Sequence, residues 1–185
     1  SPRIGTMGFV EHIRSTLHHS GFVPSFLLIA FFFILLIRAC SMRWAMAILA
    51  LPGTFAHELA HFVVGLILRA EPAGFSVLPR RSGNTWILGE VSFHRISIVN
   101  GAFIALAPIM LLPAGWLCLI HIAMPAWVAG HWVAWLLASY FTATVVFASA
   151  PSLMDIKAAI PSLIMYVAAF SMCWLAFPIV RSWVH

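Results

Sequence analysis

The segment TFAHELAHF, residues 54–62, places two histidines and one glutamate in a run that is otherwise apolar. Ionisable groups inside a membrane-embedded run are costly and usually mark a functional site. Residues four apart lie on one face of an α-helix, about one turn apart, so His57 and His61 can offer imidazole nitrogens to one metal ion. Glu58 follows the first histidine directly and would lie beside such an ion. The segment therefore predicts a helix that carries a metal site.

The spacing H-E-x-x-H is typical of a catalytic zinc site. There, Zn²⁺ lowers the pKa of a bound water and the glutamate takes the proton of that water as general base. On this interpretation Zn²⁺ is the cofactor, and Glu58 is the catalytic residue. The alternative is that His57 and His61 are neutral histidines satisfied inside a helical bundle, with Glu58 a protonated or hydrogen-bonded packing residue.

The composition indicates an integral membrane protein. Of the 185 residues, 63% are hydrophobic and 8% are charged, whereas charged residues make up roughly a quarter of a soluble globular domain. A helical span needs about 20 apolar residues, so we expect an all-α, single-domain membrane protein with about five transmembrane helices. The predicted spans are residues 22–39, 44–68, 99–120, 130–150 and 160–178.

The segments between these spans are short, with one exception. Residues 1–20 suggest a short helix on the membrane surface before the first span. Pro151 and Pro161 are the natural breaks between the last two spans. The exception is residues 69–98, where FSVLP and TWILGEVSF flank the turn-rich RRSGN. Such a pattern predicts a short β-hairpin in the loop after the second span.

The distribution of positive charge predicts the topology. Arginines precede the first span and fill the loop of residues 69–98, and positive charge in short loops marks the cytoplasmic side. We therefore expect a cytoplasmic N-terminus and a multi-pass protein of the plasma or inner membrane. The lipid bilayer is the expected environment, and no nucleic-acid surface is predicted because the basic residues form no run with interleaved aromatics.

A catalytic zinc ion needs a third protein ligand. Asp155 is the only aspartate in the chain, and in the predicted topology the fourth span delivers it to the depth of His57 and His61. However, Ser152 and Asp155 also have the spacing of a capping box, in which the aspartate only stabilises a helix start. His94, in the arginine-bearing loop, is the alternative third ligand.

Two further features concern the substrate. Asn100 could polarise a substrate carbonyl or oxyanion, or could simply cap the third span. The predicted strand of residues 85–93 could accept an unwound substrate by β-augmentation, or could merely cover the site. This strand consists of Thr85, Trp86, Ile87, Leu88, Gly89, Glu90, Val91, Ser92 and Phe93.

These features resemble the site-2 protease family of intramembrane zinc metalloproteases. The resemblance rests on HELAH in the second span, the β-prone loop after it, GAFIALAPI in the third span and a late aspartate in a proline-broken segment, over roughly residues 44–160. It implies that His57, His61 and Asp155 bind zinc and that Glu58 is the base. In the last motif many members carry asparagine, prolines and Asp-Gly, whereas this chain has SAPSLMDIK. The chain therefore resembles a compact, divergent member, and its oxyanion-stabilising residue stays unassigned.

The sequence thus predicts an enzyme, a zinc metalloendopeptidase that hydrolyses a peptide bond of a membrane-spanning or membrane-proximal protein substrate. The alternative is a non-catalytic multi-pass component of a transport or secretion assembly, with a structural metal or none. A metal transporter is disfavoured because its path would need ionisable groups in several spans at staggered depths, and only one such cluster stands out.

Overall fold

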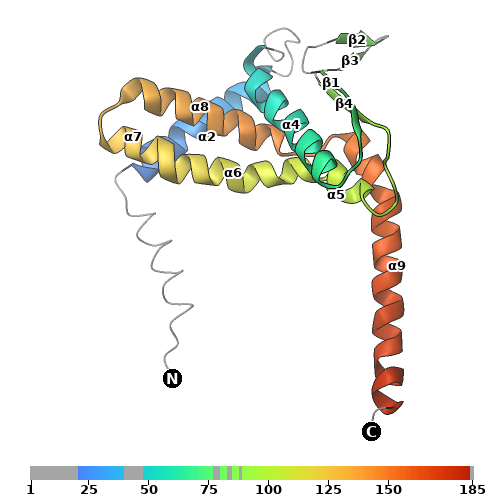
Figure 1. Cartoon of the computed structure of the whole chain (residues 1–185). Helices are drawn as coiled ribbons and strands as arrows, with labels where there is room; N and C mark the ends of the chain where they lie inside the picture. The colour runs from blue at the N-terminus through green and yellow to red at the C-terminus, as the bar shows by residue number, and fades with distance from the viewer. Residues whose placement is uncertain (1–20, 40–47, 77–79, 83–84, 88, 184–185) are drawn as a thin grey trace, which may run out of the picture.

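A computed structural model of the chain describes residues 21–39, 48–76, 80–82, 85–87 and 89–183 (Figure 1). It is mostly helical with a short antiparallel hairpin, which confirms the coarse fold class. The elements are α2 (Phe22–Ala39), α4 (Leu51–Ile67), β1 (Pro72–Ser76), β2 (Arg80–Ser82), β3 (Thr85–Ile87), β4 (Glu90–Phe93), α5 (Gly101–Ala105), the 3₁₀-helix Ala107–Met110, α6 (Leu111–Cys118), the π-helix Leu119–Ala123, α7 (Met124–Val128), α8 (Trp132–Ala148) and α9 (Leu153–Trp183). The predicted surface helix of residues 1–20 and the start of the second predicted span, residues 44–47, lie outside the described residues.

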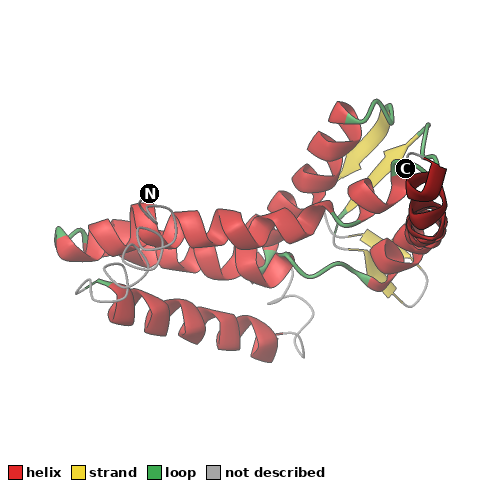
Figure 2. Cartoon of the chain, turned by 90° about the horizontal axis from the view of Figure 1, so that it is seen from below, coloured by secondary structure: helices red, strands yellow, loops and turns green. Residues whose placement is uncertain are grey.

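The helices form a layered bundle from which α9 projects. Helix α8 packs against α2 on one side and α6 on another, and the start of α4 crosses the last turns of α8 (Figures 1 and 2). Helix α9 packs its first turns against α5 and then leaves the bundle (Figure 1). The junction of α4, α5, the end of α8 and the start of α9 is therefore the place where distant parts of the chain meet.

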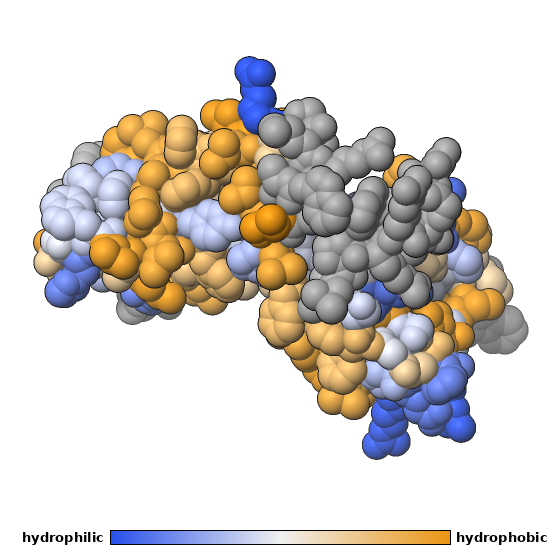
Figure 3. Space-filling view, turned by 90° about the horizontal axis from the view of Figure 1, so that it is seen from above, coloured by the Kyte–Doolittle hydropathy of each residue, from blue (hydrophilic) through white to orange (hydrophobic). Residues whose placement is uncertain are grey.

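Within the described part of the chain, three helical stretches are long and apolar enough to cross a membrane: Phe22–Ala39, Ala107–Val128 and Leu153–Leu175. The other two expected spans correspond to α4 and α8, which are apolar but have only 17 residues each. Apolar side chains cover most of the bundle face in Figure 3, and large ones are strongly exposed, for example Val133 at 72% and Phe170 at 70%. This surface is suited to lipid contact rather than to water.

Prolines explain where the helices depart from the predicted spans. The third span is interrupted around Pro108 and again by the π-helix Leu119–Ala123, which precedes Pro125; a proline cannot donate the backbone hydrogen bond that a continuous α-helix needs. The last helix begins at Leu153, earlier than the expected residue 160, and it continues through Pro161. Its start is set by Ser152 and Asp155, which form a capping box.

The hairpin occupies the loop where it was predicted, in two sections. β2 pairs with β3 next to the turn, and β1 pairs with β4 nearer the bundle, with Ser76 opposite Glu90. At the base, the backbone of Arg69 and Glu71 turns through positive φ angles of 56° and 52°, and the amide of His94 donates to the Glu71 carbonyl at 3.0 Å. This tight turn places the hairpin directly after α4 and over one of its faces.

The crossing of α4 and α8 requires a residue without a side chain. Gly53 is buried, and a Cβ atom at this position would overlap the backbone carbonyl of Thr144. Glycine normally weakens a helix by about 0.5–1 kcal/mol relative to alanine, so its presence in α4 is explained by this close approach.

We expect Gly53→Ala to destabilise the protein, although the same change in an uncrowded helix would stabilise it. The overlap is with backbone atoms, which cannot rotate away, so a loss of about 1–3 kcal/mol in the free energy of unfolding is expected. Thermal unfolding of the purified protein in detergent measures this. An unchanged or raised Tm would contradict the close crossing.

Candidate metal centre

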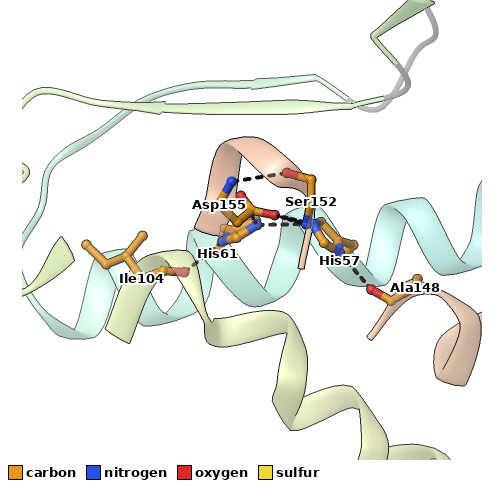
Figure 4. A network of polar contacts seen from close by, with 6 residues as sticks. All are labelled: His57, His61, Ile104, Ala148, Ser152 and Asp155. Atoms are coloured by element: carbon orange, nitrogen blue, oxygen red, sulfur yellow. Dashed lines mark hydrogen bonds and ion pairs between the residues drawn. The ribbon is translucent and has the colours of Figure 1, made fainter. Parts of the chain in front are cut away.

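Three predicted residues from two distant segments meet at the junction of α4 and α9. His57 and His61 lie one turn apart on α4, and Asp155 lies in the first turn of α9 (Figure 4). The two Nε2 atoms are 3.1 Å apart. Asp155 Oδ2 is 3.4 Å from His57 Nε2, and Asp155 Oδ1 is 3.4 Å from His61 Nε2. These three side chains form a compact group that could hold a metal ion.

Hydrogen bonds on the far side of each imidazole fix its tautomer. His57 Nδ1 lies 2.7 Å from the Ala148 carbonyl oxygen, and His61 Nδ1 lies 2.7 Å from the Ile104 carbonyl oxygen (Figure 4). A carbonyl oxygen can only accept, so Nδ1 of each ring carries the proton. In a neutral imidazole the other nitrogen then has a free lone pair. Both Nε2 lone pairs therefore converge on the space next to the Asp155 carboxylate.

Such a convergence of acceptors is unfavourable unless a proton or a metal cation lies between them. Metal-ligating histidines usually donate their other ring N–H to a carbonyl or carboxylate, as both histidines do here. With metal–ligand bonds of about 2.0–2.1 Å, a tetrahedral site separates its ligand atoms by roughly 3.3–3.4 Å. The Nε2–Nε2 separation of 3.1 Å is close to this value, and each Nε2 atom lies 3.4 Å from one of the two Asp155 oxygens. The donor set, two imidazole nitrogens and a carboxylate, consists of ligand types that zinc binds.

Asp155 forms the helix cap, and its position is compatible with the ligand role that the sequence left as the alternative. Its Oδ2 accepts a hydrogen bond from the Ser152 amide at 2.7 Å, and its own amide donates to Ser152 Oγ at 3.2 Å. This is a capping box, and it begins α9. The same hydrogen bonds orient the carboxylate toward the histidines and leave Oδ1 without a cap partner, so helix capping supports the placement of the ligand.

Glu58 lies beside this group and is buried, with 8% of its surface exposed. An isolated carboxylate in an apolar bundle is costly. The backbone of Gly89, just before β4, covers the Glu58 side chain: a Cβ atom on Gly89 would lie 2.6 Å from Glu58 Cγ. The predicted base is therefore enclosed between α4 and the hairpin.

The structure does not bring the other predicted polar residues to the group. His94 is exposed at the end of β4, where its amide bonds to Glu71, so Asp155 and not His94 completes the triad. The side chain of Asn100 is engaged locally: its Oδ1 accepts from the Ser97 amide and its Nδ2 donates to the Arg95 carbonyl. Asn100 thus orders the loop before α5.

The predicted substrate strand, residues 85–93, corresponds to β3 and β4, with Leu88 outside the described residues. Its β4 section pairs with β1, and residue 89 is the point that approaches the site.

The two carbonyl partners of the histidines were not predicted. Ile104 would bond to the amide of residue 108 in a continuous helix, but Pro108 has no amide hydrogen. Ala148 is the last residue of α8, and the amide four residues later, of Ser152, donates to Asp155 instead. Both carbonyls are therefore available, and Pro108 was the sequence signal for the first.

No family model matches this chain. Searches of curated proteins and of solved structures also give no match. The function must accordingly be inferred from the chemistry of the group itself.

We expect purified protein to contain about one metal ion per chain. His57→Ala, His61→Ala and Asp155→Ala should each remove it because each deletes one ligand. His94→Ala is the matched control and should retain the ion. Elemental analysis of protein purified without added metal gives the content, and retention of full content in all three ligand variants would contradict the site.

Ser152→Ala tests whether the cap supports the ligand. The substitution removes the hydroxyl that accepts from the Asp155 amide, and we expect metal affinity to fall by about tenfold, the lower end of the range for partners of metal ligands. Competition with a chromophoric chelator measures this affinity. Ser152→Thr keeps the hydroxyl and should bind normally. Equal affinity in all three proteins would mean that the cap stabilises only the helix.

Proposed function

We propose that this chain is a multi-pass membrane-embedded zinc metalloprotease that hydrolyses a peptide bond of a membrane-spanning or membrane-proximal protein. The single observation that carries the proposal is the convergence of two Nδ1-protonated histidines and a carboxylate beside a buried glutamate. A structural zinc site is normally closed by four protein ligands, whereas this group offers three among the residues that the structure describes. The resemblance of HELAH and its surroundings to site-2 proteases agrees with this chemistry.

The group provides the parts that peptide hydrolysis requires. Zinc, when bound by His57, His61 and Asp155, supplies Lewis acidity that lowers the pKa of water and polarises a carbonyl. The chain's own contribution is geometric, because the Ile104 and Ala148 carbonyls hold both imidazole rings in one tautomer and orientation. The Asp155 carboxylate is held in turn by the Ser152 amide.

Glu58 is the proposed general base. In H-E-x-x-H helices the glutamate lies beside the ligands, where it can accept a proton from the attacking water and pass it to the leaving amine. Its burial excludes bulk water, which strengthens electrostatic interactions with the reacting atoms. A surface glutamate could not serve in this way.

The apolar surface supports a substrate that lies in or at the membrane. Helix amides of a spanning substrate are engaged in their own hydrogen bonds, so the substrate must unwind before cleavage. The section of the hairpin at residues 85–93 is the proposed acceptor for the unwound strand, by β-augmentation. The arginine distribution supports a cytoplasmic N-terminus in a plasma or inner membrane.

The test is Glu58→Gln, which keeps the size of the side chain and removes the proton acceptor. We expect cleavage of a co-expressed single-span reporter to fall by about 10²- to 10⁴-fold, the usual contribution of general acid–base catalysis. The metal content should stay at one ion per chain because Glu58 is not a ligand.

Glu71→Gln is the matched control, since it makes the same chemical change at an exposed carboxylate paired with Arg95 at 3.0 Å. It should cleave as the wild type does. Cleavage by Glu58→Gln at the wild-type rate would eliminate Glu58 as the base. A chain that binds metal and cleaves nothing in any form would instead favour the non-catalytic membrane component.

A further inference from the structure

The hairpin touches α4 at three places. Phe75 of β1 makes edge contacts with Phe55 and Phe62, with ring centroids 6.1 Å and 5.7 Å apart. Phe93 of β4 lies directly on Gly65, near the end of α4. The third place is Gly89, which lies against Glu58. Phe75 and Phe93 fix the hairpin over α4, and Gly89 contacts Glu58, the proposed general base.

These contacts define one face of α4. Phe55, Glu58 and Phe62 are separated by three and four positions, so they share a face of the helix. His57 and His61 are directed instead toward the carbonyls of α5 and α8 and toward Asp155. Helix α4 therefore directs its two proposed ligands toward α5, α8 and α9, and it directs Glu58 toward the hairpin.

The contact at residue 89 leaves no room for a side chain. A Cβ atom there would lie 2.6 Å from Glu58 Cγ, 2.7 Å from Oε1 and 2.9 Å from Cδ. All three distances are below the usual contact distance of carbon and oxygen atoms. Any larger residue would force either the carboxylate or the hairpin to move.

We propose that Gly89 is a positioning residue for Glu58: its bare backbone closes over the carboxylate and holds it in the orientation required for proton transfer. The hairpin thereby has a role in the chemical step, separate from any role in binding the substrate strand. This inference rests on the proposed proteolytic function. A displaced general base loses activity steeply, because a misplacement of about 1 Å can cost about 10²-fold in rate.

The kinetic test is Gly89→Ala, assayed with a purified single-span substrate in detergent. We expect kcat to fall by about 10- to 100-fold, while KM changes by less than about twofold and the metal content is unchanged. A rise in KM at constant kcat would overturn the inference, because it would mean that residue 89 acts through substrate binding.

Two glycine variants serve as matched controls. In Gly74→Ala the new Cβ lies in the same hairpin but meets only the Ser92 hydroxyl, at 2.9 Å. In Gly115→Ala it meets the Val146 side chain at 2.6 Å, which matches the crowding at residue 89 but lies between α6 and α8. Both should keep the wild-type kcat. A comparable loss of kcat in either control would overturn a specific role for Gly89.

A double-mutant cycle tests the contact independently of activity. Gly89→Ala should lower Tm in the wild-type background and leave it unchanged in a Glu58→Ala background, where the crowded atoms are absent. If Gly89→Ala alone is not recovered folded, the double variant should restore folding, and failure to do so would overturn the inference. An equal loss of Tm in both backgrounds would also overturn it.

The two hypotheses fail in distinguishable ways. If the wild-type chain binds metal and cleaves no substrate, the proposed function fails. If the wild-type chain cleaves and Gly89→Ala has the same kcat, only the positioning role fails.

Discussion

Two backbone carbonyls determine the chemistry of the junction. Without the hydrogen bonds from His57 to Ala148 and from His61 to Ile104, each imidazole could rotate or change tautomer, and its Nε2 lone pair would have no defined direction. These two bonds also tie α4 to the end of α8 and to α5, so the same interactions hold the helices together and aim the proposed ligands. A helical bundle offers few free carbonyls, and this one has them where Pro108 and the end of α8 interrupt the hydrogen-bond ladder.

The remaining parts of the junction follow from this arrangement. The lone pairs of His57 and His61 converge on one space, and the capping box of α9 places a carboxylate beside the same space. Glu58 lies on the same helix because it directly follows His57 in the sequence. The hairpin then covers the face that carries the glutamate. Helix α4 contributes both histidines and the glutamate, α9 contributes the aspartate, and each of these side chains is held by a contact with backbone atoms.

The spacing of the histidines was sufficient to predict which helix carries the site, because helical geometry alone places positions four apart on one face. The hairpin was predicted from turn chemistry at residues 80–84, and the metal group from His57, His61 and Asp155. What the sequence could not decide was whether Asp155 caps or binds, because both roles need the same residue at the same spacing. In the structure Asp155 caps α9 through Oδ2 and its carboxylate also lies 3.4 Å from both histidines, so its geometry is compatible with both roles. The contact between Gly89 and Glu58 could not be predicted for another reason. It depends on how the hairpin lies on α4, which no local sequence pattern encodes.

The passage of α9 through Pro161 was also beyond local pattern. Pro161 marks a break in most helices, yet α9 passes through it, with Ser162 and Tyr166 just beyond it bonded to the backbone of Ala102 and Val99. These tertiary hydrogen bonds attach the helix to the α5 region on the far side of the proline. Five expected spans accordingly became three helical stretches of full membrane length and two shorter ones within the described residues.

The distribution of the three proposed ligands along the chain links the assembly of the centre to the assembly of the fold. Two come from a single turn of α4, and the third follows 94 residues after His61. An ion bound there closes a long loop of the chain, and its binding energy contributes to the stability of the α4–α9 contact. A nascent chain that has inserted only its first helices has an incomplete centre, with two imidazoles and no carboxylate. The proposed hydrolytic activity would thus arise late in biogenesis, after α9 has docked on α5, and a partly made chain would lack it.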